Sequence, residues 1–211
     1  MKKPTVNWPA AMKPLIKKYK TAKHPLEAKN LYEMLVMVVL SAQTTDVLIN
    51  QLAPALFKAV PTMAALAKVQ PEDLYPYISK VRSFGNKAKW LAQIAHLLKK
   101  DSAIPLTMDE LVNLPGIGRK SANVIKRFAK AKAEGIVVDV HVIRVAPRLG
   151  IVGEDKPDKM EKEMMAILPE SEWDAGMCMS FLGREICRPE PLCEVCLMKK
   201  VCAYYQNLIA S

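Results

Sequence analysis

The stretch Leu114-Pro115-Gly116-Ile117-Gly118-Arg119-Lys120 separates two helical patterns. Thr107 and Glu110 upstream form a capping-box pattern, which predicts a helix that ends just before the Pro-Gly turn. A second helix is predicted to begin at Gly118 or Arg119, at the end of the stretch, and to stop before Gly135. Two helices joined by Pro-Gly-x-Gly indicate a helix-hairpin-helix over about residues 107–130.

The same turn has the composition of an anion site. Gly116 and Gly118 permit a tight turn and a close approach of the backbone to a ligand. Backbone N–H groups at the start of a helix lack intrahelical partners and favour a negative charge. The natural anion is a DNA phosphate, which such groups contact without reading the base sequence. With Leu114 as the hydrophobic anchor and Arg119 and Lys120 beside the turn, the motif predicts DNA binding rather than a turn without a ligand.

Composition supports a polyanionic partner. The 211 residues include 31 Lys and Arg against 21 Asp and Glu, a formal net charge of +10. A surplus of this size is typical of proteins that bind nucleic acid. Hydrophobic residues make up 51% of the chain, which excludes wholesale disorder. Aromatic residues make up only 6%, which argues against a single-strand binder built mainly on stacking platforms.

The sequence predicts neither a secretion signal nor a membrane span. The basic start lacks the apolar segment of a signal peptide. The longest strongly apolar run, Met34 to Leu40, is too short to cross a bilayer and indicates a buried helix. We therefore expect a cytoplasmic, nucleoid-associated protein with no membrane partner, in a compartment where disulfides are disfavoured.

Helical periodicity dominates the rest of the chain and predicts an all-α class. The helix at 86–100 places its apolar residues on one face, with lysines opposite. The segment 136–143 is rich in β-branched residues, but an isolated strand would have no partner, so we predict a loop leading into a helix near Asp139. The other expected helices cover residues 9–20, 30–41, 44–58, short segments between 62 and 81, 157–167 and 172–185.

Four of the five cysteines are close together near the end of the chain, in the pattern C-x5-C-x2-C-x5-C. Four thiolates at this spacing in an intracellular protein indicate a metal site rather than disulfides. Only one pair is short, which favours a [4Fe–4S] cluster and leaves tetrahedral zinc as the alternative. The predicted ligands are Cys187, Cys193, Cys196 and Cys202, while Cys178 is predicted to be a buried helical thiol.

Together these motifs resemble the endonuclease III family, the DNA glycosylase/AP lyases of the helix-hairpin-helix superfamily. The family's motifs are matched by the hairpin, by VDVHVIRV at 138–145 and by the four-cysteine loop. LSAQTTD at 40–46 and NKA at 86–88 match two further helices of the family. The resemblance extends over about residues 26–205.

The resemblance implies a fold of two α-helical lobes with DNA in the cleft between them. A six-helix lobe would hold residues 25–133, with the hairpin. The second lobe would combine residues 1–24 with 134–211, including the four-cysteine loop at 187–202. Lys120 and Asp139 would face each other across the cleft, and a monomer is expected.

The resemblance also implies roles for individual residues. Lys120 would be the nucleophile that attacks the sugar C1′, forms a Schiff base and permits β-elimination. Asp139 would be the essential carboxylate, which stabilises the cationic sugar and assists proton transfer. Gln43 would enter the gap left by the extruded nucleotide. The loop would carry Arg188, Lys199 and Lys200 to DNA phosphates.

Asp139 also has a role that its neighbours predict directly. It stands between Val138 and Val140, and a carboxylate in apolar surroundings must be satisfied. We expect it to cap the following helix through the N–H groups near His141 and Val142.

Two departures from the family pattern bear on specificity. Arg82-Ser83-Phe84 stands where the family places an apolar wedge against the opposite DNA strand, and Ser83 is a poor wedge. Val140 stands where the family usually has threonine.

The expected activity is base excision repair of double-stranded DNA that carries a damaged or abasic nucleotide. The enzyme would remove oxidised or otherwise damaged pyrimidines and cleave the strand by β-elimination. Two alternatives stay open: a monofunctional glycosylase of altered base preference, in which Asp139 activates water, and a non-catalytic helix-hairpin-helix DNA-binding protein.

Overall fold

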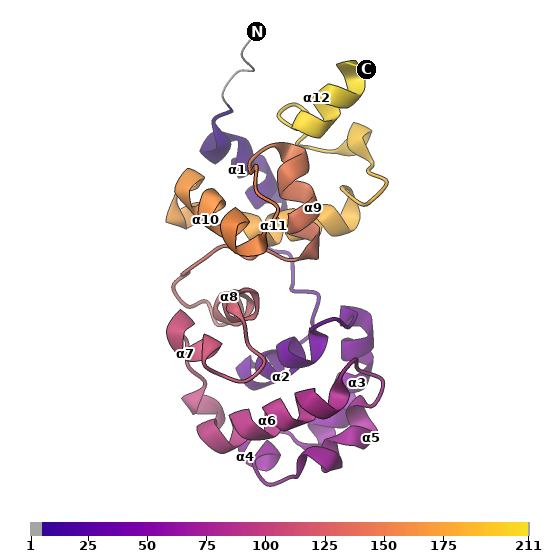
Figure 1. Ribbon diagram of the computed structural model, residues 1–211, viewed down its shortest axis with the longest axis vertical. Coiled ribbons are helices and arrows are strands. Elements are labelled where there is room, and N and C mark those ends of the chain that lie inside the picture. The colour runs from indigo at the N-terminus through magenta and orange to yellow at the C-terminus, as the bar shows by residue number, and fades with distance from the viewer. Residues whose placement is uncertain (1–5, 211) are drawn as a thin grey trace. The chain divides into compact units, whose positions relative to one another are not determined.

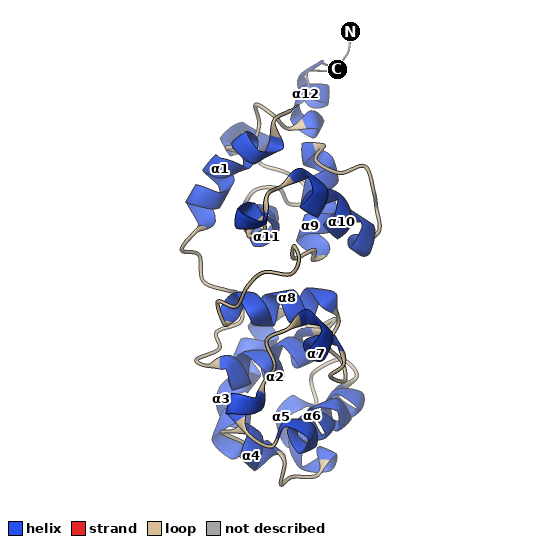
Figure 2. Ribbon diagram, turned by 90° about the vertical axis from the view of Figure 1, so that its left-hand side faces the viewer, coloured by secondary structure: helices blue, strands red, loops and turns tan. Residues whose placement is uncertain are grey.

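The computed structural model describes residues 6–210, and within that range it consists of α-helices, short 3-10 turns and loops, with no strand (Figures 1 and 2). The predicted all-α class is therefore confirmed. No helix in the described range combines the length and the apolar character that a membrane crossing requires.

The chain divides into two compact units. One unit is Lys23–Glu134, and the other combines the chain up to Ala22 with the part that begins at Gly135. The chain therefore passes from one unit to the other twice, once after α1 and once after α8.

The unit Lys23–Glu134 is built around α2 (Leu31–Ser41). Asn30 caps this helix by accepting a hydrogen bond from the Glu33 N–H. Nearly every side chain of α2 is buried, because α3, α6 and α8 pack on it from different sides. The surrounding elements are α3 (Asp46–Ala59), α4 (Met63–Leu66), α5 (Tyr75–Ile78), α6 (Phe84–Leu98), α7 (Met108–Val112) and α8 (Arg119–Phe128), with 3-10 turns η1 (Pro71–Leu74) and η2 (Asp101–Ala103).

In the other unit, α11 (Ala175–Glu185) is the buried centre. Its most extensive contacts are with α9 (Val140–Leu149), and it also packs on α1 (Trp8–Tyr19). Gly183 allows this packing, since a Cβ there would lie 2.8 Å from the Cβ of His141. The remaining elements are α10 (Pro157–Ile167), α12 (Ala203–Ala210), and the 3-10 turns η3 (Glu170–Glu172) and η4 (Cys193–Val195).

Two aromatic rings fasten the N-terminal helix to this unit. Tyr19 stacks on Phe181 with the ring centroids 5.5 Å apart. The Tyr19 hydroxyl donates to the Glu185 carboxylate at 2.7 Å, and Lys18 pairs with the same carboxylate at 3.4 Å. The N-terminal helix α1 and the residues from Gly135 onward therefore share one core.

The end of the helix after the hairpin agrees with the prediction that it stops before Gly135. The helix after the hairpin ends at Phe128, because Lys130 takes a left-handed conformation (φ 54°) and the Ala131 N–H returns to the Lys126 carbonyl. No glycine signals this end. Helix α12 was not predicted from the sequence.

The segment before Asp139 is a loop, as predicted. It contains no strand, and α9 begins at Val140 with Asp139 as its N-cap. Cys178 is fully buried in α11, which was also predicted.

Candidate functional site

The turn between α7 and α8 is closed by its own backbone and by one aromatic ring. The Ile117 N–H donates to the Leu114 carbonyl at 3.1 Å. Gly116 has φ +76°, and a Cβ at this position would lie 2.5 Å from the Trp90 ring. Only glycine satisfies both conditions without strain. The turn is therefore encoded by residues 114–117 together with Trp90 of α6.

The fold does not require glycine at position 118, in contrast to position 116. The Gly118 backbone is extended (φ −97°), and no atom lies within 4 Å of the position that a Cβ would occupy. It is the N-cap of α8, and no side chain caps this helix. The space in front of the first N–H groups of α8 is consequently open, as an anion site requires.

The predicted hairpin residues separate into a core group and an exposed group. The Leu114 side chain is buried, which fits its role as an anchor. Arg119 and Lys120 are exposed at the first turn of α8, and the Arg119 guanidinium donates to the Glu134 carbonyl at 3.3 Å. Lys120 therefore combines an accessible amine with the positive end of a helix dipole.

An ion pair between a buried lysine and a partly exposed glutamate holds the two hairpin helices together. The Lys126 ammonium donates to the Leu106 carbonyl at 2.6 Å and lies 3.3 Å from the Glu134 carboxylate. Glu134 in turn accepts from the Met108 N–H at 2.6 Å. This hydrogen bond and Lys126 hold the pKa of Glu134 below its usual value. Glu134 thus adds a second hydrogen bond at the start of α7, beside the predicted N-cap Thr107.

The Thr107–Glu110 interaction differs from the predicted capping box. Thr107 accepts from the Glu110 N–H at 3.4 Å, as expected. The Glu110 carboxylate, however, accepts from the Thr107 hydroxyl rather than from its backbone N–H.

Asp139 is held by both of its carboxylate oxygens. Oδ1 accepts from the N–H groups of His141 and Val142 at 2.9 and 3.0 Å, the cap that its apolar neighbours predicted. Oδ2 accepts from the Ser180 hydroxyl at 2.6 Å and lies 3.9 Å from the Arg184 guanidinium. The side chain is 10% exposed, so the carboxylate is fixed in direction while part of it stays accessible.

The two residues that follow Asp139 have different surroundings. Val140 is 70% exposed at the first position of α9, an unusual place for a large apolar side chain. The ring nitrogen Nδ1 of His141 lies 3.2 Å from Arg144, which also donates to the carbonyls of Gly183 and Cys187. His141 therefore helps to hold α9 against the end of α11.

Gln43 lies on the exposed segment between α2 and α3. Its backbone is left-handed (φ 56°), an uncommon conformation for a residue other than glycine. Ser83, just before α6, shares this conformation (φ 56°) and is also exposed. Phe84 is engaged by an edge-to-face contact with Tyr75, so its ring is not free to act as a wedge.

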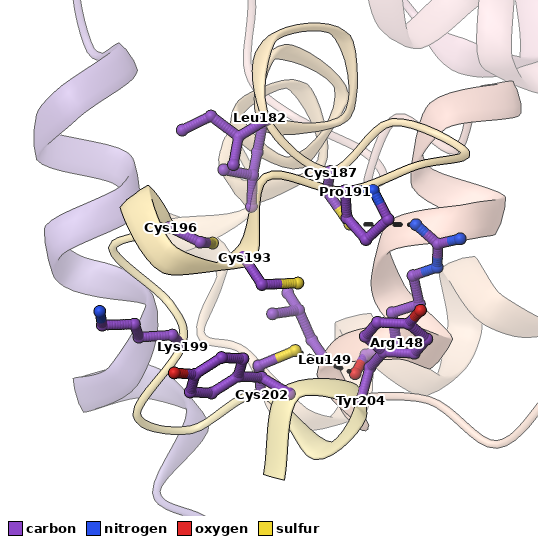
Figure 3. A pocket seen from close by; sticks show the side chains of 12 residues that line it. Arg148, Leu149, Leu182, Cys187, Pro191, Cys193, Cys196, Lys199, Cys202 and Tyr204 are labelled. Carbon is purple, nitrogen blue, oxygen red and sulfur yellow. Dashed lines mark hydrogen bonds between the residues drawn. The ribbon is translucent and has the colours of Figure 1, made fainter. Parts of the chain in front are cut away.

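The four predicted cysteine ligands line one cavity. Figure 3 shows their side chains converging on the space between α9, the end of α11 and the loop before α12. The cavity itself is small, about 20 Å³. In the described part of the chain, no three His, Cys, Asp or Glu side chains are gathered closely enough to hold a single metal ion.

Arg148 of α9 organises the start of this loop. Its guanidinium donates to the carbonyls of Arg188 and Pro189 at 2.6 and 3.0 Å and lies 3.7 Å from the Cys187 Sγ. It also lies over the Tyr204 ring, 5.0 Å from the centroid. Figure 3 shows it beside Cys187 at the edge of the cavity.

The environment of the thiols is unfavourable for free thiolates. Burial raises the pKa of Cys193, Cys196 and Cys202, and the neighbouring thiolates raise it further. A bound cation would reverse this, because it stabilises the deprotonated sulfur. The four side chains line one cavity and supply the sulfur ligands that a metal cofactor would use.

The basic residues of the loop are not equivalent. Lys200 is exposed, and Arg188 is exposed while donating to the Glu185 carbonyl at 3.0 Å. Lys199 is tied within the loop, since its ammonium donates to the Glu194 carbonyl at 2.7 Å and pairs with the Glu194 carboxylate at 3.6 Å. Arg188 and Lys200 present their charge outward more fully than Lys199.

Two residues that contact the site, Ser180 and Lys87, were not predicted from the sequence, although each has a recognisable sequence signal. Ser180 is the one hydroxyl in the apolar helix of Cys178, and this isolation is its signal. Lys87 occupies the apolar stripe of α6, seven residues before Ile94, so the prediction that the lysines of this helix all lie opposite its buried face is wrong. The spacing of Lys87 from Leu91 and Ile94 was a signal of its burial that the prediction did not use.

The chain is similar to known proteins over most of its length. Residues 36–170 match the family model described as HhH-GPD superfamily base excision DNA repair protein. Endonuclease III of Thermotoga maritima is 36% identical over 181 residues, which cover 83% of this chain and 84% of that protein. Endonuclease III of Rickettsia felis is 35% identical over 188 residues, which cover 87% of each chain.

Solved structures agree with this. A non-covalent endonuclease III–DNA complex matches with a TM-score of 0.86 and 32% identity, covering 98% of this chain and 100% of that one. A trapped covalent endonuclease III–DNA intermediate matches with the same score and identity, covering 97% and 99%.

The hairpin, the helical fold and these matches define a helix-hairpin-helix protein of DNA base excision repair. Within that class, the chain belongs to the endonuclease III family.

Proposed function

We propose that this protein removes damaged pyrimidines from double-stranded DNA and cleaves the abasic strand, with Lys120 as the Schiff-base nucleophile. Membership of the endonuclease III family makes the chain a base excision repair glycosylase and AP lyase. The observation that carries the residue assignment is the exposed Lys120 amine at the uncapped start of α8, directly behind the Gly116 turn. The expected place of action is nucleoid DNA.

Lys120 supplies the covalent chemistry. Its neutral amine attacks C1′ of the damaged nucleotide, and the bond between C1′ and the base breaks with its electron pair leaving on the base. The C1′–O4′ bond of the sugar ring then opens as O4′ takes up a proton and the nitrogen lone pair forms the imine, which makes the C2′ proton acidic. Loss of that proton breaks the C3′–O bond, and the 3′ phosphate departs. The amine must be deprotonated to attack.

Asp139 supplies a carboxylate of fixed direction. It stabilises the positive charge that develops on the sugar and accepts or returns a proton during base release and elimination. The cap on α9 and the Ser180 hydroxyl hold the carboxylate in one orientation, so little reorganisation is needed when charge develops. A monofunctional glycosylase would use the same carboxylate to activate water, and it would not need Lys120.

The remaining predicted residues have two proposed roles. Most contact DNA phosphates, and Gln43 fills the space left by the extruded nucleotide. The turn at Gly116 and Gly118, anchored by Leu114, presents the N–H groups of α8 to a phosphate, with Arg119 adjacent. Arg188 and Lys200, and to a lesser extent Lys199, add positive charge on the cysteine loop. Gln43, exposed on its strained segment, fills the space left by the extruded nucleotide.

The four cysteines are the proposed ligands of a [4Fe–4S] cluster. The support is their spacing, their convergence on one cavity and the membership of the family. The cluster, when bound, holds the loop 187–202 in shape, so its contribution is architectural. Zinc is the alternative, and iron analysis with the visible absorption spectrum separates the two, since zinc is colourless.

Borohydride trapping tests the function. The protein is incubated with a duplex carrying one abasic site, borohydride is added, and covalent protein–DNA complex is measured. We expect a complex in the wild type and in the control Lys130→Gln, which removes an exposed charge just after α8. We expect none in Lys120→Gln, with DNA binding retained.

Each other outcome selects an alternative. A wild type that releases damaged bases without a trapped complex would be a monofunctional glycosylase, and Asp139→Asn should then abolish release. Binding without base release or trapping would leave a helix-hairpin-helix DNA-binding protein. Trapping that survives Lys120→Gln would show that a different amine is the nucleophile.

A further inference from the structure

One lysine of α6 is buried beneath the Gln43 segment. Lys87 is only 2% exposed, whereas Lys89 on the same helix is exposed. The Lys87 ammonium donates to the carbonyls of Leu40 and Ala42 at 2.8 and 2.5 Å. It also lies 3.5 Å from the Thr44 hydroxyl oxygen. An ammonium has three donors, and here each one has an acceptor.

These acceptors lie on both sides of Gln43. Leu40 belongs to the last turn of α2, Ala42 is the C-cap of that helix, and Thr44 follows Gln43. The last carbonyls of a helix lack intrahelical partners and carry its negative dipole end, so a cation is favoured there. One ammonium therefore satisfies the end of α2 and fixes the chain before and after Gln43.

The Gln43 backbone needs such support. Its left-handed conformation (φ 56°) costs free energy for a residue with a Cβ, and it persists only where neighbouring contacts impose it. Within the segment itself, the Thr44 N–H donates to the Ser41 carbonyl at 3.0 Å. Lys87 adds the longer-range contacts, which come from a different helix. The Lys87 N–H also bonds to the carbonyl of Ser83, the second left-handed residue.

Lys87 is mostly charged at neutral pH, although its pKa lies closer to neutrality than that of an ordinary lysine. Burial lowers its pKa from 10.5 to about 8. The carbonyl acceptors favour the ammonium form, whereas the loss of hydration opposes it. An apolar side chain could fill the same space. It would leave the Leu40 and Ala42 carbonyls without the hydrogen bonds that Lys87 donates.

We propose that Lys87 is a positioning residue, which holds the Gln43 segment in the conformation that enters the DNA helix. This rests on the proposed role of Gln43. Lys87 does not touch the reacting atoms, so its effect is confined to the step in which the extruded nucleotide is replaced. Cleavage should depend on Lys87 only when the DNA offers an orphan base for Gln43 to engage.

Two duplexes make the test selective. In one, an abasic site stands opposite adenine, so an orphan base is present. In the other, it stands opposite a tetrahydrofuran residue, which has no base. Single-turnover cleavage of each is measured for Lys87→Met, which keeps the aliphatic stem and removes the ammonium. We expect cleavage to fall about tenfold on the first duplex, as for one lost charged hydrogen bond, and less than about twofold on the second.

Three variants complete the design. Gln43→Ala should show the same substrate dependence, and adding Lys87→Met to it should cause no further loss, because one residue acts through the other. Lys87→Arg should recover part of the rate on the first duplex, since it restores a cation. Lys89→Met removes a charge from the exposed face of the same helix and should leave both rates unchanged.

Several outcomes would overturn the proposal. Equal slowing on both duplexes would mean that Lys87 serves only the general fold, and multiplicative effects of Lys87→Met and Gln43→Ala would mean that the two act independently. If Lys87→Met fails to fold by circular dichroism, Lys87→Gln replaces it, and the same comparison applies. Lys120→Gln run alongside should abolish cleavage of both duplexes, so a failure of the proposed function gives a different pattern.

Discussion

The hairpin turn and the cysteine loop are stabilised in different ways. The turn is six residues long and is closed by a backbone hydrogen bond and by the fit of Gly116 against Trp90, while the Lys126–Glu134 pair joins the chain segments on either side of it. The loop at 187–202 is longer and largely exposed. Its fixed points are the Arg148 contacts at one end and the convergence of four thiols in the middle.

The hairpin turn is stabilised by the chain itself, whereas the cysteine loop is expected to need a bound ligand for its stability. The atoms that shape the hairpin belong to the chain, so the turn should persist whatever is bound. The loop has few buried side chains, with Met198 and Cys202 as the main ones, and they supply little hydrophobic stabilisation. The cavity at its centre is where the missing stabilisation should arise.

Loss of one cysteine ligand should have the largest effect. We expect Cys196→Ser to reduce bound iron from about four atoms per chain to below about one, because a cluster needs all of its thiolate ligands. Loop 187–202 should then become the main site of proteolysis, while the hairpin unit resists cleavage. Iron analysis and mass spectrometry of protease fragments measure both effects.

The fifth cysteine provides the matched control. Cys178 is buried in α11, outside the loop, and Cys178→Ala should retain the iron and the protease resistance of the wild type. A loop that stays protected in Cys196→Ser would contradict the comparison, since it would show that the chain alone holds it.

The two hairpin glycines provide the next largest effect. Gly116→Ala should destabilise the hairpin unit by about 1–2 kcal/mol from its left-handed backbone and by about a further 1–3 kcal/mol from the clash with Trp90. Gly118→Ala has extended backbone and open space, so its stability should change by less than about 0.5 kcal/mol. Thermal melting followed by circular dichroism measures both.

DNA binding should rank these two variants differently. In Gly118→Ala, the added methyl group would lie at the N-cap of α8, beside the N–H groups to which a phosphate is proposed to bind. We expect Gly118→Ala to weaken duplex binding about tenfold, the loss of roughly one charged hydrogen bond, although it remains folded. Unchanged affinity in Gly118→Ala would remove the phosphate from this position.

Arg148 tests how far side-chain contacts with α9 stabilise the loop. Arg148→Ala removes two carbonyl contacts and the Tyr204 stacking, which together should cost about 2 kcal/mol in the stability of the loop. We expect iron to be lost severalfold faster to a chelator, with the melting of the hairpin unit unchanged. Arg188→Ala, which removes a nearby exposed guanidinium, is the control and should lose iron at the wild-type rate.

The same contrast explains what the sequence predicted. Gly116 and the Asp139 cap follow from local rules, since each depends on residues within a few positions. The four cysteines were recognisable by spacing alone. Lys87, Ser180 and Arg148 act on segments about 40 residues away, and only the folded chain brings their partners to them. The exact end of α8 at Phe128 had no local signal, because Lys130 adopts the conformation usually signalled by glycine.

Glu134 should give the smallest effect, and it tests whether charge contributes to the hairpin. Its pKa is lowered in the folded chain, so its stabilising effect is present above the unfolded value of about 4.5 and is lost as the pH falls through the lower folded value. Glu134→Gln should therefore weaken protection of the Met108 amide against hydrogen exchange a fewfold at pH 7. At about pH 3 the variant and the wild type should exchange at similar rates.

A comparison at matched pH is essential, because the intrinsic exchange rate also depends on pH. Lys126→Met should reproduce the loss at pH 7, since it removes the other half of the ion pair. A difference between Glu134→Gln and the wild type that persists unchanged at pH 3 would show that the shape of the side chain, rather than its charge, caps α7. The Gly116 turn should stay intact in either case, because its closure involves no titratable group.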